Sequence, residues 1–158
     1  MKGHFGRRQF VGVGVAFAAL FIARGASAAA AKKPSIKIYK DPSCGCCTAW
    51  VERLESAGFV TQVEERGDMS AVKASLGVPD DMASCHTAVT GGYTIEGHVP
   101  PADIKKLLAT RPKAKGLAVP GMPVNSPGME VPGEPNERYT VWLFQADGKR
   151  TAFAHHGG

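Results

Sequence analysis

The chain is 158 residues long and carries 19 lysines and arginines against 14 aspartates and glutamates, a formal net charge of +5. Four of the basic residues and none of the acidic ones lie in the first 28 residues, so the remainder has 15 basic against 14 acidic residues. A remainder so close to neutral has no electrostatic reason to bind nucleic acid or an anionic membrane, and its length of about 130 residues suits one domain rather than two.

The first 28 residues have the features of an export signal. The pair Arg7-Arg8 precedes an apolar run over residues 10–23, and Ala26-Ser27-Ala28 offers small residues for cleavage. The run is shorter than the roughly 20 apolar residues that a spanning helix needs. Residues 7–11 also resemble a twin-arginine signal, which directs folded proteins to export. We therefore expect residues 1–28 to be removed and residues 29–158 to form one periplasmic domain with no stable membrane insertion.

The segments that follow alternate between strand and helix patterns. Residues 36–40 predict a strand and residues 48–57 a helix that ends at Gly58, followed by a strand over 59–64 and a short helix over 69–76. Residues 87–89 and 93–96 predict two strands joined by a turn at Gly91-Gly92, and residues 101–109 predict a helix with Pro101 in its first turn. This order is the outline of an α/β, thioredoxin-like fold.

Residues 112–137 are rich in proline and glycine and predict a long loop. A loop of that length in a small domain usually has a task. It carries two methionines in matching contexts, Pro120-Gly121-Met122-Pro123 and Pro127-Gly128-Met129-Glu130. Residues 139–145 regain a strand pattern before a turn over 146–149, and we expect this extra C-terminal strand to join the sheet.

The cysteines are the most informative residues of the chain. Cys44, Cys46 and Cys47 lie between the first predicted strand and helix, and Cys85 precedes the third predicted strand. In a thioredoxin-like fold that later segment packs against the start of the helix, so we expect four sulfurs to converge. Unpaired N–H groups and the dipole at a helix N-terminus favour thiolates, which bind metals and attack disulfides.

Two chemistries compete for these sulfurs. Cys44 and Cys47 alone form a C-x-x-C redox motif. Cys46, a third thiol next to Cys47, would permit other disulfide pairings and so disturb a simple dithiol exchange. Three sulfurs in one turn can instead bind one soft ion or bridge several. Thiolates and thioethers select Cu(I), while structural zinc sites usually use two spaced pairs and iron–sulfur sites wider spacings. We therefore predict copper, in a cluster of more than one ion, with zinc as a substitute.

Each candidate also has a structural interpretation. Four cysteines in an exported protein form two structural disulfides by default, although the adjacent Cys46-Cys47 pair leaves mostly strained pairings. Met122 and Met129 could pack on the sheet, and His86 could be a surface residue rather than a ligand. His98, at a turn, and the tail pair His155-His156 are weaker candidates.

Five motifs, in order along the chain, resemble those of the CopG-type family of exported metal-binding proteins, which is linked to bacterial copper and silver resistance. The resemblance covers about residues 35–155 and implies a thioredoxin-like fold in which the four cysteines hold Cu(I) as a multinuclear cluster, with silver as a substitute. The same motifs contain His86, Met122 and Met129, which complete the predicted metal site. The motifs are Asp41-Pro42-Ser43-Cys44-Gly45-Cys46-Cys47, Cys85-His86-Thr87-Ala88, Glu96-Gly97-His98-Val99-Pro100, Leu117-Ala118-Val119-Pro120-Gly121-Met122-Pro123 and Ser126-Pro127-Gly128-Met129-Glu130.

Three functions are consistent with the sequence. The first is a periplasmic Cu(I)-binding protein that protects the envelope and exchanges copper with other periplasmic copper-handling proteins. The second is an enzyme, a thiol–disulfide oxidoreductase with Cys44 as nucleophile and Cys47 as resolving thiol. The third is a disulfide-stapled interaction module that binds through the Pro/Gly/Met loop. Replacing Cys46 separates the first two, since it should impair metal binding and spare dithiol exchange.

Overall fold

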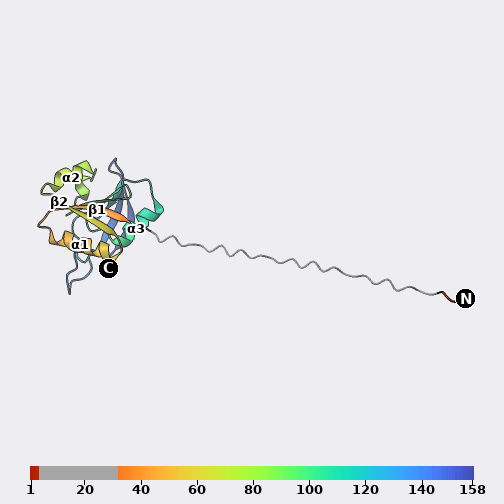
Figure 1. Cartoon of the computed structure of the whole chain (residues 1–158). Helices are drawn as coiled ribbons and strands as arrows, with labels where there is room; N and C mark the ends of the chain where they lie inside the picture. Colours follow the sequence, from red (N-terminus) through yellow and green to blue (C-terminus); the bar gives the residue numbers. More distant parts are fainter. Residues whose placement is uncertain (4–31) are drawn as a thin grey trace. The chain divides into compact units, whose positions relative to one another are not determined.

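The computed structural model describes residues 1–3 and 32–158 (Figure 1). The predicted export signal falls almost wholly on residues 4–31 and so lies outside the described residues. From Lys32 onward the chain forms one compact unit. Its elements are β1 (Ser35–Lys40), α1 (Gly45–Ser56), β2 (Val60–Glu65), α2 (Met69–Ser75), a 3-10 turn η1 (Asp80–Met82), β3 (Thr87–Thr90), β4 (Tyr93–Glu96), α3 (Pro101–Thr110), β5 (Gly116–Ala118), β6 (Tyr139–Phe144) and β7 (Arg150–His156).

The strands of the described domain form one seven-stranded mixed sheet in the order β2-β1-β3-β4-β5-β6-β7. The β1–β2 and β4–β5 pairs are parallel, and the other neighbours are antiparallel. Helices α1 and α2 lie on opposite sides of β1 and β2 (Figure 1). Strand β4, in the middle of the sheet, is buried at all four positions because both of its faces are covered.

The main core lies between the sheet and helices α1 and α3. Strand β1 alternates exposed and buried residues, which directs Ile36 and Ile38 into this core. Helix α1 contributes Trp50 and Leu54, both fully buried, and α3 contributes Leu107. The Trp50 indole also donates a hydrogen bond from Nε1 to the carbonyl oxygen of Val99, at 3.0 Å. The core thus ties α1 to the turn that precedes α3.

Most predicted elements are confirmed within one or two residues, and the α/β class is confirmed. Gly91 and Gly92 form the predicted turn between β3 and β4, with φ values of 56° and 89° that favour glycine. Pro101 opens α3 as predicted, and Arg111 ends it in the left-handed conformation. The thioredoxin-like assignment stays a prediction.

The structure differs from the prediction at three places: the start of one helix and two additional strands. Helix α1 begins at Gly45 instead of residue 48, which places Cys46 and Cys47 inside its first turn; Cys47 is fully buried there, so packing outweighs the low helix propensity of these residues. The loop over 112–137 contains β5, three buried residues that pair with β4. The chain adds β7 after β6, so the expectation of one extra C-terminal strand was too low.

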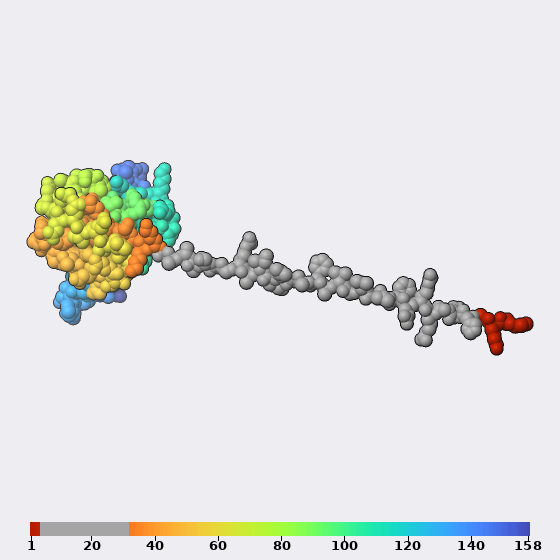
Figure 2. Space-filling view, in the orientation of Figure 1, coloured from red at the N-terminus to blue at the C-terminus, as the bar shows by residue number. Residues whose placement is uncertain are grey.

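The part of the loop beyond β5 divides into a packed and an exposed portion. Residues 130–138 are all exposed, and the space-filling view shows this light-blue segment protruding from the domain (Figure 2). Within residues 1–3 and 32–158, no helix has the length and apolar character that crossing a bilayer requires.

We predict that Trp50→Phe lowers the free energy of unfolding by about 1–3 kcal/mol, because the buried carbonyl of Val99 loses its donor. Urea denaturation followed by circular dichroism would measure the change. Trp142→Phe is the matched control, since Trp142 is only partly buried and packs on a smaller cluster. Equal losses in the two variants would contradict a special role for the indole N–H.

Candidate metal centre

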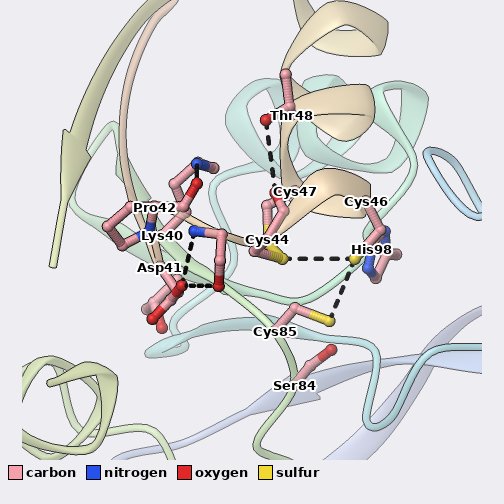
Figure 3. The surroundings of a disulfide bond; sticks show 12 residues. Lys40, Asp41, Pro42, Cys44, Cys46, Cys47, Thr48, Ser84, Cys85 and His98 are labelled. Carbon is pink, nitrogen blue, oxygen red and sulfur yellow. Dashed lines mark hydrogen bonds between the residues drawn. A yellow bond between two sulfur atoms is a disulfide. The ribbon is translucent and has the colours of Figure 1, made fainter. Parts of the chain in front are cut away.

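Four cysteine sulfurs lie together at the start of α1. Cys44 is the N-cap residue of the helix, Cys46 and Cys47 lie in its first turn, and Cys85 lies in the loop that leads into β3. All four Sγ atoms are within 4.8 Å of one another (Figure 3). The sulfur of Cys46 contacts both segments, at 3.5 Å from that of Cys44 and 3.7 Å from that of Cys85. The predicted convergence of the two cysteine segments is therefore confirmed.

The structure holds the cluster in a partly oxidised form. Cys44 and Cys47 are joined by a disulfide, while Cys46 and Cys85 are free thiols. A disulfide sulfur carries no thiolate charge, so only two thiols of the cluster can bind a metal in this form. All four become available as thiolate ligands once the disulfide is reduced by two electrons.

The electrostatic setting of the thiols differs between the two segments. No acidic side chain lies in the first turn of α1, and Cys44 makes no side-chain capping hydrogen bond, so the positive end of the helix faces the sulfurs unopposed. Burial, with the neighbouring Cys46, raises the pKa of Cys85 to about 11. Without a cation Cys85 therefore keeps its proton at neutral pH, and a coordinating metal would displace that proton.

Two fully buried histidines have unpartnered ring nitrogens, although among the described residues the group close enough to share one ion comprises the four cysteines alone. His86 and His98 are both fully buried, with ring centroids 4.9 Å apart, and His86 also packs on the Trp50 ring at 4.3 Å. Neither ring nitrogen of His86 has a hydrogen-bond partner, and Nε2 of His98 also lacks one. Burial lowers the pKa of both residues, so both imidazoles are neutral, the form that binds metals.

His98 was only a weak candidate in the sequence, and the fold brings it near the disulfide (Figure 3). Its Nδ1 lies 2.9 Å from the carbonyl oxygen of Pro127, which orients the ring and leaves Nε2 unpartnered. Its position in the Glu96-Gly97-His98 motif was the available signal. By contrast, His155 and His156 lie on β7 with other partners: His155 Nδ1 is 3.0 Å from Thr140 Oγ1, and His156 Nε2 is 2.6 Å from Asp103 Oδ2.

The methionine loop packs against both cysteine segments. Gly128 has a φ of 86°, and a Cβ there would lie 2.9 Å from the carbonyl oxygen of Cys46 and 2.7 Å from the backbone nitrogen of Trp50. Met129 follows directly and is partly buried. At the other end of the loop Gly121 donates its N–H to the carbonyl of Ala83, which brings the 53% exposed Met122 to the segment before Cys85.

An ion pair secures this loop to α1. Glu130 Oε1 lies 2.9 Å from Arg53 Nε, and its other carboxylate oxygen accepts a hydrogen bond from the backbone N–H of Gly128 at 3.0 Å. Arg53 and the local hydrogen bonds lower the pKa of Glu130 against the opposing effect of burial, which is the largest single influence on it. The loop is thus held at the residue that approaches the helix most closely.

Comparison with known proteins gives matches of two kinds. A family described as "Protein of unknown function, DUF411" matches residues 82–129, which contain Cys85, His86 and both loop methionines. Two solved structures named copper resistance protein CopG, form 1 and form 2, are each 46% identical to this chain. Form 1 covers 80% of this chain and 100% of its own, with a TM-score of 0.74, and form 2 covers 79% and 99%, with 0.75. No curated protein matches the chain.

We predict that Gly128→Ala displaces the loop from α1. Alanine at this position combines backbone strain with a collision against helix backbone that cannot move without unwinding the first turn. The expected results are a loss of stability in urea denaturation and faster alkylation of Cys46, measured by mass spectrometry.

Gly133→Ala is the matched control for this substitution. Gly133 has a similar φ of 88° but nothing within 4 Å of the added Cβ. It should therefore cost only the backbone strain, about 1–2 kcal/mol, with no change at Cys46. If both variants lose the same stability and leave the Cys46 alkylation rate unchanged, the close approach of Gly128 does not hold the loop.

Proposed function

This chain belongs to the CopG family of copper resistance proteins, and on that premise we propose that it binds Cu(I) through the thiolates of Cys44, Cys46, Cys47 and Cys85. The observation that carries the proposal is the convergence of all four sulfurs within 4.8 Å. A copper-related function follows from the family and from a sulfur cluster that could hold a metal. Cu(I) is the bound cargo, and Ag(I) or zinc could take its place in the same sulfur set.

The geometry favours a cluster of more than one ion. The sulfur of Cys46 contacts those of both Cys44 and Cys85, at 3.5 and 3.7 Å, so its thiolate could bridge ions bound by the other two. The unpartnered nitrogens of His86, which follows Cys85 in the chain, and of His98, which lies near the disulfide (Figure 3), would gain a partner as ligands. Met122 and Met129 supply thioethers from the loop that packs on both cysteine segments.

The proposed setting is the bacterial periplasm. The expected export signal and the twin-arginine pair support this location. In that compartment the protein would sequester Cu(I) or hold it in a redox-active cluster, receiving it from other copper-handling proteins or passing it on to them. Copper resistance would follow from keeping the free ion away from the envelope.

A second candidate function is thiol–disulfide exchange, favoured by the disulfide between Cys44 and Cys47. The reduced protein would use the Cys44 thiolate to attack a substrate disulfide and form a mixed disulfide. Cys47 would then attack Cys44, releasing the substrate as a dithiol and forming the Cys44–Cys47 bond. The same sulfurs would serve both functions, and Cys46 belongs to the first alone.

Cys46→Ser separates the two functions. We expect it to abolish tight Cu(I) binding, because the sulfur that contacts both cysteine segments is removed, while the Cys44–Cys47 pair still exchanges with a small disulfide. Competition with a chromogenic Cu(I) chelator measures the first property, and thiol titration after incubation with oxidised glutathione measures the second. Glu52→Gln, on the exposed side of α1, is the control. Native copper affinity in the Cys46 variant would reject the thiolate site.

We also predict that copper binding depends on the oxidation state of the protein. Reduced protein should bind Cu(I) and lose its titratable thiols, whereas protein with the Cys44–Cys47 disulfide should bind far less, since two ligands are missing. Elemental analysis with thiol titration measures both. Free Cu(I) at 100 times the dissociation constant should raise the free energy of unfolding of the reduced form by about 2.7 kcal/mol. Equal copper uptake by both forms would contradict the proposal.

A further inference from the structure

A buried carboxylate is hydrogen-bonded to the segment that carries Cys85. Glu96, the last residue of β4, has a side chain with no exposed surface. Its oxygens have three donors: the Nζ of Lys73 at 2.6 Å, the backbone N–H of Ser84 at 2.7 Å and the hydroxyl of Thr87 at 2.7 Å. Lys73 also donates to the Thr87 hydroxyl at 3.1 Å, which closes the network.

The bonded groups flank the candidate ligands on both sides. Ser84 immediately precedes Cys85, and Thr87 immediately follows His86. The carboxylate therefore accepts hydrogen bonds from the residues at both ends of this two-residue segment. A main-chain hydrogen bond from Gly97 to the carbonyl of His86, at 3.0 Å, holds the middle of the same segment. Together these contacts fix where the thiol and the imidazole lie relative to α1.

The charge of the carboxylate is balanced from the opposite side of the sheet to α1. Lys73 belongs to α2, and its side chain is only 13% exposed. Burial raises the pKa of Glu96, and Lys73 is the strongest influence opposing that shift. A buried ion pair of this kind rarely stabilises a protein more than apolar residues of the same volume would. The effect of this ion pair is therefore to be found in the positions that it fixes for the residues it contacts.

We infer that Glu96 and Lys73 are positioning residues of the metal centre, which hold Cys85 and His86 in place for the ion through Ser84 and Thr87. The inference rests on the proposed function for the identity of the ion. It differs from a general role in stability, because the contacts are to the two residues on either side of the candidate ligands Cys85 and His86. Residues that orient metal ligands typically affect metal affinity roughly 10–100-fold.

The test replaces the ion pair with apolar residues of similar volume, as Lys73→Met/Glu96→Leu. Such a replacement can keep the fold while it removes the acceptor of the Ser84 backbone N–H and of the Thr87 hydroxyl. The matched control is Lys37→Met/Glu64→Leu, a partly exposed pair on β1 and β2 with a 2.7 Å contact, in which Glu64 also pairs with Arg66. Circular dichroism establishes that each variant is folded at the temperature of the measurement.

Two readouts follow the position of Cys85. The first is Cu(I) affinity of the reduced protein by chelator competition, with the thiolate-to-copper absorption band as a spectroscopic check. The second uses no copper: with the Cys44–Cys47 disulfide intact, phenylarsine oxide captures Cys46 and Cys85 together only if their sulfurs stay close, at 3.7 Å in this structure. Cys85→Ser sets the background of this capture.

We expect the Lys73→Met/Glu96→Leu variant to lose at least roughly tenfold in Cu(I) affinity and to capture the arsenical more weakly, while the control double variant matches the wild type. A folded variant with native affinity and native capture overturns the inference. If the wild type binds no Cu(I) but the variant still captures less arsenical, the proposed function fails and the positioning role stands.

Thr87→Val provides a second test, to be used if the double variant does not fold. It removes only the hydroxyl that bonds to Glu96 and Lys73 and keeps the volume of the side chain. A fall of a few fold in affinity and in arsenical capture supports the positioning role. Unchanged values in this folded variant overturn it.

Discussion

The packing around Trp50 is the constraint on which the candidate site depends. Its indole Nε1 is hydrogen-bonded to Val99, its ring packs on His86, and its backbone nitrogen lies where a side chain at Gly128 would collide. Helix α1, the segment before β3, the turn before α3 and the methionine loop therefore meet at one buried side chain. The sulfurs of α1 gain their neighbours because this residue joins segments that are far apart in the sequence.

The centre combines features that are costly in a protein without a ligand. Three imidazole nitrogens are buried without partners, and burial keeps Cys85 protonated at neutral pH. A soft cation would remove this cost, because it would take the place of the thiol proton and give the imidazole nitrogens a partner. The disulfide joins two of the four sulfurs, so the proposed copper binding and disulfide formation would compete for the same atoms.

Local patterns were sufficient for most of the fold. Strand β1 and helix α3 have clear periodicity and end signals, and the Gly91-Gly92 turn has the conformation that two glycines favour. Strand β5 had no such signal. Its three residues lie in a segment rich in proline and glycine, and they become a strand because β4 and β6 provide partners on both sides.

The sequence by itself determined which chemistry the protein can perform, because the spacing of Cys44, Cys46 and Cys47 and the residue types in the later motifs specify soft ligands at a helix start. It also marked Cys85 and His86 as a second ligand segment. Only the tertiary structure showed how the histidines differ: His98 is oriented by Pro127 and keeps an unpartnered Nε2, whereas His156 is paired with Asp103 on β7. The tertiary structure also brought Glu96 into a hydrogen bond with Ser84, the residue before Cys85. Burial and hydrogen-bond partners depend on contacts between distant segments, so no local pattern could have supplied them.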